Sequence, residues 1–165
     1  MGVSDAELEV YQALDAEKGL PIRLWVYLTP EAEAVERLLA DGPWQGDKVR
    51  VVGIKAFADG ALGSRGAQLS EDYADEPGHR GAAITSEAEL LSLAARCLEV
   101  RAQLAVHAIG DAAVASVLDA FEEARRLVPS AADVPLRVEH AQVVQPADRG
   151  RFSALNVVAS MQPVH

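Results

Sequence analysis

Cysteine and aromatic residues are scarce in this sequence. Of its 165 residues one is cysteine and 5% are aromatic, while half are hydrophobic, mainly alanine, leucine and valine. The single cysteine, Cys97, excludes a disulfide within the chain and is typical of a reducing compartment, so we predict a cytoplasmic location. Because Cys97 falls within an apolar helical pattern, it is interpreted as a core residue and not as a nucleophile.

Basic residues are outnumbered by acidic ones. The chain has 15 lysines and arginines against 25 aspartates and glutamates, a formal net charge of −10. This balance argues against nucleic acid and anionic membranes as partners, because phosphate groups select basic surfaces. Long apolar runs are also lacking, and residues 1–20 do not have the basic start and apolar run of a signal peptide. The partner predicted by these absences is a small-molecule substrate.

Short apolar runs alternate with helical periodicity along the chain. The predicted strands are Ile22–Leu28, Val51–Phe57, Gln103–Ala108, Leu136–Glu139 and Val157–Met161. The predicted helices begin at capping or first-turn signals, namely Ser4 with Glu7, Thr29 with Pro30, Ser86 with Glu89, Asp111, and Gln145 with Pro146. A long glycine-rich loop is expected from residue 59 to about residue 83.

This alternation predicts an α/β fold with parallel strands. Two architectures fit, an open doubly wound sheet or a TIM-like (β/α)₈ barrel. No G-x-G-x-x-G follows a strand, which weakens the dinucleotide-binding version. Because the chain has about five strands, opens on a helix and stops after a strand, we expect residues 1–165 to be one incomplete barrel domain. We expect its first and last barrel strands to be lacking.

Histidines follow the predicted strands. His107, His140 and His165 lie at or just beyond strand ends, and Lys55 lies near the end of another. In a barrel these ends form one face, where active sites are built. Singly, each histidine is also explained as a hydrogen-bonded structural residue, and the lysine as one that reaches solvent. Together they suggest a metal centre, in which the lysine must be deprotonated or carboxylated because an ammonium has no lone pair.

Four motifs carry a resemblance to a known family. They are K-A-F-A-D-G at 55–60, V-H-A-I-G-D at 106–111, V-E-H-A-Q at 138–142 and S-M-Q-P at 160–163. In this order they resemble family 3 of the amidohydrolase superfamily, of which the chain looks like an internal fragment. The resemblance implies a (β/α)₈ barrel beside a small β-sandwich. It also implies hydrolysis of non-peptide C–N bonds, in amides or N-formyl compounds, with one or two divalent metals, usually zinc.

The resemblance assigns three metal ligands and leaves the catalytic residue unknown. Lys55 matches the carboxylated lysine of the family, and His107 and His140 match two histidine ligands. The H-x-H of the first barrel strand and the late catalytic aspartate have no counterpart in the chain. We therefore expect the chain alone to be inactive. Two alternatives stay open, a non-catalytic barrel relative that binds a small molecule and an unrelated open α/β domain.

Supporting roles fall to residues around these motifs. Asp111 is most simply a helix N-cap that also orients the His107 loop, and Asp59 holds its loop or supports a ligand. Glu139 alternates with His140, so one is expected to face inward and the other outward or towards a neighbouring strand, with Arg137 able to pair with a carboxylate there. The remaining candidates near substrate or ligands are Arg65, Gln162 and His165. Exposed sheet edges predict possible self-association.

Overall fold

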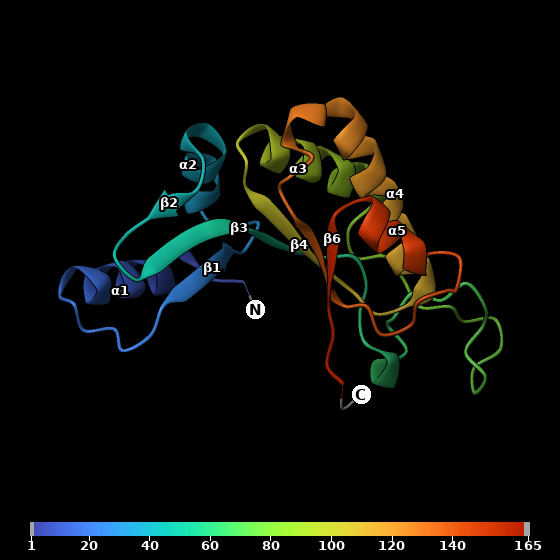
Figure 1. Cartoon of the computed structure of the whole chain (residues 1–165). Helices are drawn as coiled ribbons and strands as arrows, with labels where there is room; N and C mark the ends of the chain where they lie inside the picture. Colours follow the sequence, from blue (N-terminus) through green and yellow to red (C-terminus); the bar gives the residue numbers. More distant parts are fainter. Residues whose placement is uncertain (1, 164–165) are drawn as a thin grey trace.

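A computed structural model describes residues 2–163 as one twisted sheet with helices packed along it (Figure 1). The strands are β1 (Leu24–Leu28), β2 (Trp44–Gln45), β3 (Val49–Phe57), β4 (Gln103–Ala108), β5 (Leu136–His140) and β6 (Val157–Ser160). The helices are α1 (Asp5–Ala16), α2 (Ala34–Asp41), α3 (Glu87–Glu99), α4 (Asp111–Leu127) and α5 (Arg149–Ala154), with short 3₁₀ turns η1 (Leu62–Ser64) and η2 (Pro129–Ala131).

The sheet confirms the predicted α/β class and strand order. Its neighbours run β1-β3-β4-β5-β6, and each of these pairs is parallel. The two-residue β2, which the sequence did not predict, pairs antiparallel with β3. Consecutive parallel strands joined by helices are the arrangement from which a (β/α)₈ barrel is built.

Helix starts were predicted correctly where the capping box is complete. Ser4 and Ser86 each accept the backbone N–H of the glutamate three residues on, and that glutamate bonds back to the serine N–H. Thr29 does not cap a helix, because α2 begins only at Ala34. The first N–H groups of α2 are instead met by the Asp5 carboxylate, at 2.7 and 2.8 Å. A long-range cap of this kind leaves no local signal.

Two further helix starts differ from the prediction. The N-cap of α4 is Gly110, so Asp111 is the first helical residue and its side chain bonds outside the helix. The fifth helix begins at Arg149, later than the proline signal at residue 146 suggested, and no side chain caps it. Gly110-Asp111 before α4 and Gln145-Pro146 before α5 each fit a turn as well as a helix start, so the sequence does not fix the first helical residue.

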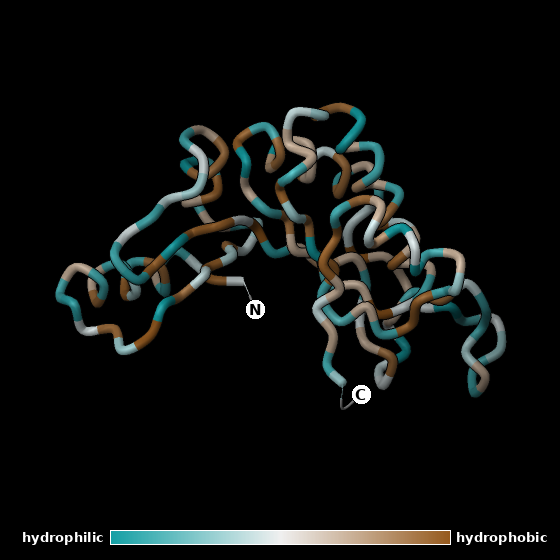
Figure 2. Tube along the Cα trace, viewed as in Figure 1, coloured by the Kyte–Doolittle hydropathy of each residue, from teal (hydrophilic) through white to brown (hydrophobic). Residues whose placement is uncertain are grey.

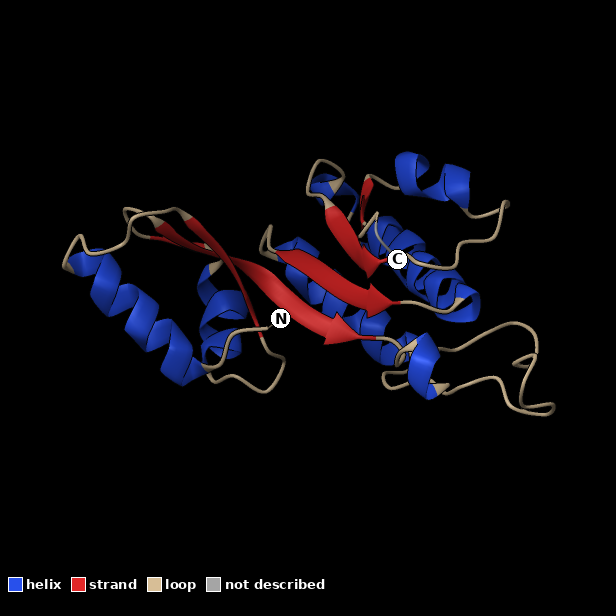
Figure 3. Ribbon diagram, turned by 90° about the horizontal axis from the view of Figure 1, so that it is seen from below, coloured by secondary structure: helices blue, strands red, loops and turns tan. Residues whose placement is uncertain are grey.

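The two faces of the sheet have different roles. One face packs against the helices, and Figure 3 shows the other face in front, with α3 and α4 behind the middle strands β3 and β4. Figure 2 shows hydrophobic residues along β3 and β4 and alternating hydrophobic and hydrophilic residues along the helices. The helix-side core is fully buried and includes Ile54, Leu104, Val106, Val138, Leu90, Val114 and Phe121. The polar side chains of β4 and β5, among them His107 and Glu139, therefore lie on the opposite, open face.

A bulge decides which face Lys55 occupies. The register between β1 and β3 shifts midway along the pair, which inserts one extra residue into β3. Before the bulge Val49 and Val51 are buried, and after it Ile54 and Ala56 are buried. The change of phase places Lys55 on the open face, together with Phe57, where strict alternation from Val51 would have turned it toward the helices.

The outer strand β6 has an edge that pairs with no strand among residues 2–163. Val158 and Met161 near this edge are exposed. An apolar unpaired edge favours pairing with another chain. We expect concentration-dependent association in sedimentation velocity, reduced at least severalfold by Met161→Lys. Val10→Lys, at an exposed apolar position on α1, is the control. Monomers at every concentration, or equal effects of the two changes, would rule out the edge.

No helix within residues 2–163 has the length and apolarity needed to cross a membrane.

Candidate functional site

Two histidines meet on the open face at the carboxyl ends of β4 and β5. The rings of His107 and His140 lie edge to face with centroids 4.6 Å apart. Phe57, at the end of β3, lies in register with His107 and has its ring centroid 5.5 Å away. Lys55 precedes Phe57 by two residues on β3 and lies on the same open face. Its ammonium is 4.1 Å from the centroid of the Phe57 ring. The structure thus brings Lys55, His107 and His140 to one end of the sheet.

The backbone of His140 is unusual. His140 has φ of 75° and Ala141 has φ of 43°, both in the left-handed region that side chains with a Cβ rarely adopt. Simple alternation would turn Glu139 and His140 different ways, as the sequence predicted. The left-handed turn at the last strand residue brings the imidazole back beside His107. Strain of this kind, on the order of 1–3 kcal/mol, is typical of functional sites.

Lys55 is buried, and no carboxylate among residues 2–163 forms an ion pair with it. Its side chain is 7% exposed, and Nζ donates to the carbonyl of Ala56 at 3.1 Å. Burial lowers the pKa of Lys55 to about 8, against the opposing attraction of the Glu139 carboxylate. At pH 7 roughly a tenth of this amine is therefore uncharged, far more than in an ordinary lysine.

Glu139 is fixed as a carboxylate on the same face. Arg137 donates from Nε to its Oε1 at 2.9 Å, which is the pairing expected from the sequence. Burial alone would raise the pKa of Glu139, but hydrogen bonds from Ser160 and Arg137 hold it below its usual value. Its register position is beside His107. Glu139 therefore supplies a permanent negative charge to the face that holds Lys55.

The acceptors around the imidazoles indicate their tautomers. His107 Nε2 lies 3.1 Å from the carbonyl oxygen of Gly60 and 3.5 Å from Oδ1 of Asp59. Both partners only accept, so Nε2 carries the proton in neutral His107. Burial lowers the pKa of His107, and the bond to Gly60 opposes that shift. His140 Nδ1 lies 2.8 Å from Oε1 of Gln162, so a proton on Nδ1 satisfies that contact.

Asp59 ties three segments together, as the sequence suggested. Its side chain is buried and accepts backbone N–H groups from Gln68 at 2.9 Å, Ile109 at 3.0 Å and Gly110 at 2.8 Å. The long loop after β3 is thereby attached to the loop that follows His107. This network holds the His107 ring where β4 ends.

Asp111 performs a similar task, in place of the N-cap role predicted for it. It accepts the backbone N–H of Ser70 at 3.0 Å and the Ser70 hydroxyl, and it also accepts the Gln145 amide at 2.5 Å. Sequence reasoning missed Ser70 and Gln145, because nothing local marks a polar residue that bonds across 34 or 41 positions.

Two other candidates are not brought to the imidazoles. Arg65 pairs with Asp75 at 2.7 Å and Glu76 at 3.2 Å within the long loop, and its side chain is partly exposed. His165 lies outside the described residues 2–163. Within that range, no group of three or more histidine, cysteine, aspartate or glutamate side chains is arranged to hold a metal ion.

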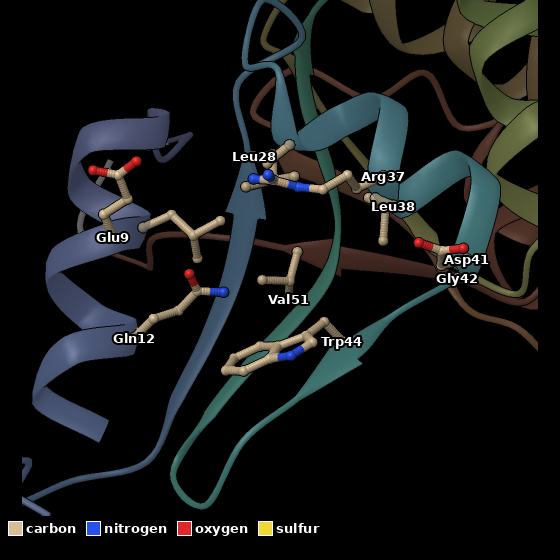
Figure 4. Close-up of a pocket in the computed structure, with 11 residues that line it drawn as sticks. Glu9, Gln12, Leu28, Arg37, Leu38, Asp41, Gly42, Trp44 and Val51 are labelled. Carbon is tan, nitrogen blue, oxygen red and sulfur yellow. The ribbon is translucent and has the colours of Figure 1, made fainter. Parts of the chain in front are cut away.

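A cavity of about 400 Å³ lies elsewhere, between α1, α2 and β2 (Figure 4). Leu28, Leu38 and Val51 line it, and Trp44 forms one wall. These residues belong to the helix-covered side of the sheet. Because the cavity contains none of the polar residues of the strand ends, we assign the candidate site to the open face.

Comparison with known proteins identifies relatives over the whole chain. The sequence model of the amidohydrolase family matches residues 1–165. Protein LONG AFTER FAR-RED 3 of Arabidopsis thaliana is 33% identical over 159 residues, which are 95% of this chain and 27% of that protein. N-substituted formamide deformylase of Arthrobacter pascens is 35% identical over 104 residues, 63% of this chain and 18% of that enzyme.

A solved structure shows the same fold. The crystal structure of an uncharacterized metal-dependent hydrolase from Pyrococcus furiosus superposes with a TM-score of 0.87 at 36% identity. The superposition covers 99% of this chain and 33% of the Pyrococcus chain. The chain therefore spans between about a quarter and a third of the length of the Arabidopsis and Pyrococcus proteins.

Proposed function

The chain belongs to the amidohydrolase family, and we propose that it carries metal-binding side chains of a hydrolase that acts on non-peptide C–N bonds. The proposed substrate is a small amide or N-formyl compound, as the name of the Arthrobacter relative suggests. The observation that carries the proposal is the meeting of His107 and His140, rings 4.6 Å apart, on the face that also holds the buried Lys55.

The two imidazoles fit a divalent cation. A ligating histidine offers one nitrogen to the metal and donates the other N–H to an oxygen. His107 donates from Nε2 to the Gly60 carbonyl and so keeps the Nδ1 lone pair free. His140 with its proton on Nδ1, facing Gln162, keeps Nε2 free. Neutral imidazole is a preferred zinc ligand, and zinc is the ion we propose.

Lys55 fits the third position after carboxylation. The lone pair of its neutral amine attacks the carbon of carbon dioxide, one C–O bonding pair moves to oxygen, and an N–H proton leaves to solvent. The resulting carbamate carries a negative charge and oxygen donors. Burial favours this reaction because it keeps part of the amine unprotonated at neutral pH. We propose that the carboxylated side chain completes the ligand group with His107 and His140.

The chemistry divides between the metal and the chain. A divalent metal, when bound, polarises a carbonyl group and lowers the pKa of water. The chain holds the ligands, with Asp59 and Gly60 fixing His107, and Gln162 fixing His140. We assign no residue of this chain to carry the proton to the leaving nitrogen. For that reason we expect the chain alone to release negligible amine.

Zinc titration of the metal-free chain tests the proposal. We expect weak, sub-stoichiometric binding, reduced on the order of a hundredfold by His107→Ala or His140→Ala, since each change removes a ligand. His79→Ala is the matched control, because His79 Nε2 bonds to the Arg65 carbonyl within the loop. Equal affinity in the parent and in both ligand variants would contradict the site.

Amine release from a simple N-substituted formamide gives the second measurement, with the Arthrobacter deformylase as positive control. We expect release close to the uncatalysed rate from residues 1–165. Turnover that survives His107→Ala would exclude the proposed metal site. A longer protein that also carries the H-x-H and late-aspartate motifs can be tested in the same way. If it binds zinc and releases no amine, the alternative of a non-catalytic barrel relative is favoured.

A further inference from the structure

We propose that Gly60 is a positioning residue, whose backbone carbonyl fixes the proton of His107 on Nε2 and leaves Nδ1 as the donor nitrogen. The inference deepens the proposed function and rests on it only where it names Nδ1 as a metal donor. The assignment of the proton is a statement about this chain alone.

The contact itself allows one proton arrangement. A carbonyl oxygen accepts and never donates, so the 3.1 Å contact between Gly60 and His107 Nε2 requires a hydrogen on that nitrogen. Oδ1 of Asp59 lies 3.5 Å from the same nitrogen. The three backbone N–H groups bound to Asp59 hold its carboxylate in place beside the ring. Carbonyl and carboxylate together favour the Nε2–H form and disfavour a lone pair there.

A backbone crossing holds the Gly60 carbonyl. Gly60 N–H donates to the carbonyl of Gly66 at 3.0 Å, and Gly66 N–H donates to the carbonyl of Ala61, also at 3.0 Å. The two ends of the segment from Gly60 to Gly66 therefore lie side by side and contact each other through backbone atoms. The last residue of this closed segment precedes Ala67, which is fully buried. The carbonyl is thus set by main-chain packing and not by a movable side chain.

Glycine at position 60 lets the two segments approach closely at this crossing. A Cβ there would lie 3.1 Å from Cα and from the carbonyl carbon of Gly66, which are backbone atoms unable to rotate away. A Cβ at Gly66 would lie 3.3 Å from Cα of Gly60, a milder contact. A Cβ at Gly63, inside the same loop, would meet nothing within 4 Å. The three substitutions Gly60→Ala, Gly66→Ala and Gly63→Ala thus form a series in which the backbone contact of the added Cβ becomes progressively weaker.

Long-range proton–nitrogen correlation spectra of nitrogen-15-labelled histidine test the proposal. They distinguish the two neutral tautomers, and a pH of about 8 keeps imidazole neutral. The His107 signals are assigned by their loss in His107→Ala. In the metal-free chain we expect Nε2–H for the parent and for Gly63→Ala, and a mixture or Nδ1–H for Gly60→Ala. A fully retained Nε2–H form in Gly60→Ala, or an equal change in Gly63→Ala, would overturn the proposal.

Gly66→Ala, which introduces the milder contact, is the control for a loss of folding in Gly60→Ala. If Gly60→Ala loses its dispersed spectrum, Gly66→Ala is measured instead, with a smaller change expected in the same direction. An unchanged tautomer in Gly66→Ala then overturns the proposal. A ring released to water also takes a mixture of tautomers, so a change counts only in a variant whose other amide signals keep the dispersion of the parent.

Zinc binding separates this inference from the proposed function. We expect zinc, added alone, to bind about 10- to 100-fold more weakly to Gly60→Ala than to the parent, with Gly63→Ala unchanged. If no chain binds zinc but the tautomer changes as expected, the positioning role of Gly60 stands and the metal site fails. If zinc binds the parent and Gly60→Ala equally, the metal site stands and Nδ1 positioning by Gly60 is wrong.

Discussion

Replacing Asp59 with asparagine is expected to lower the free energy of unfolding by about 3 kcal/mol. The Asp59 side chain is 1% exposed, and its two oxygens accept N–H groups from Gln68, Ile109 and Gly110. Asparagine has one acceptor oxygen, so its amide group must face at least one of these N–H donors. One charge-assisted hydrogen bond is lost and the remaining ones weaken. The new amide N–H group also faces a buried backbone N–H, and neither of these two donors has an acceptor there.

Urea unfolding followed by circular dichroism measures this loss. Asp75→Asn is the matched control, because Asp75 lies in the same long loop but is largely solvated and only pairs with Arg65 at the surface. We expect Asp75→Asn to change stability by less than about 0.5 kcal/mol. If the two variants are equally stable, Asp59 does not hold the loop against the end of β4 as the structure indicates.

Asp59 also shows what could be predicted from this sequence. Its place in the K-A-F-A-D-G motif indicated a loop-holding role, and the structure confirms it. The partners were not predictable, because two of the three N–H donors lie 50 and 51 residues away and are backbone groups. A backbone donor has no residue type, so no pattern in the sequence marks it.

The strands were predictable for a simple physical reason. Parallel strands covered by helices have apolar side chains at every helix-facing position, and the five apolar runs stand out between amphipathic helices. The two-residue β2 carries no such run, and its residues Trp44 and Gln45 are exposed. The β3 bulge was equally invisible, since the extra residue lies within residues 51–54, a run without a polar residue that would show the change of face.

The placement of three candidate residues at one end of the sheet was predictable, and the backbone geometry around them was not. The motifs placed Lys55, His107 and His140 at strand ends, and the structure brings them to one end of the open face. Alternation predicted that Glu139 and His140 face different ways. The left-handed φ of 75° at His140 overrides that rule. The sequence gives no sign of it, because the position is not a glycine or asparagine, the residues that favour positive φ. Local backbone conformation at a strand end is set by the tertiary structure around it.

Lys55 offers the sharpest test of the open face, because its stability effect and its proposed role have opposite signs. Lys55→Met is expected to raise the free energy of unfolding of the metal-free chain at pH 7 by on the order of 2–3 kcal/mol. Burial lowers the pKa of Lys55 from 10.5 to about 8, so folding at pH 7 must take a charged ammonium out of water. Methionine fills a similar volume without a charge.

The pH dependence identifies the cause of this gain. Between the folded pKa of about 8 and the unfolded value of 10.5, the unfolded chain holds the proton of Lys55 and the folded chain does not. Stability of the parent should therefore rise with pH across this window, at up to about 1.4 kcal/mol per pH unit. Lys55→Met lacks this rise, so the difference between the two chains should shrink from pH 7 toward pH 10.5.

Urea titrations at about pH 7, 8.5 and 10 in carbon dioxide-free buffer provide the measurement, with Lys48→Met as control. Lys48 donates from its ammonium to the Leu20 carbonyl, and its replacement removes a contact without relieving a burial cost. If Lys55→Met is no more stable than the parent at pH 7, the ammonium is solvated in solution and the open face is not as closed around it as described. If it is more stable and also loses zinc affinity, Lys55 is retained at the expense of stability, which is the pattern expected of a ligand.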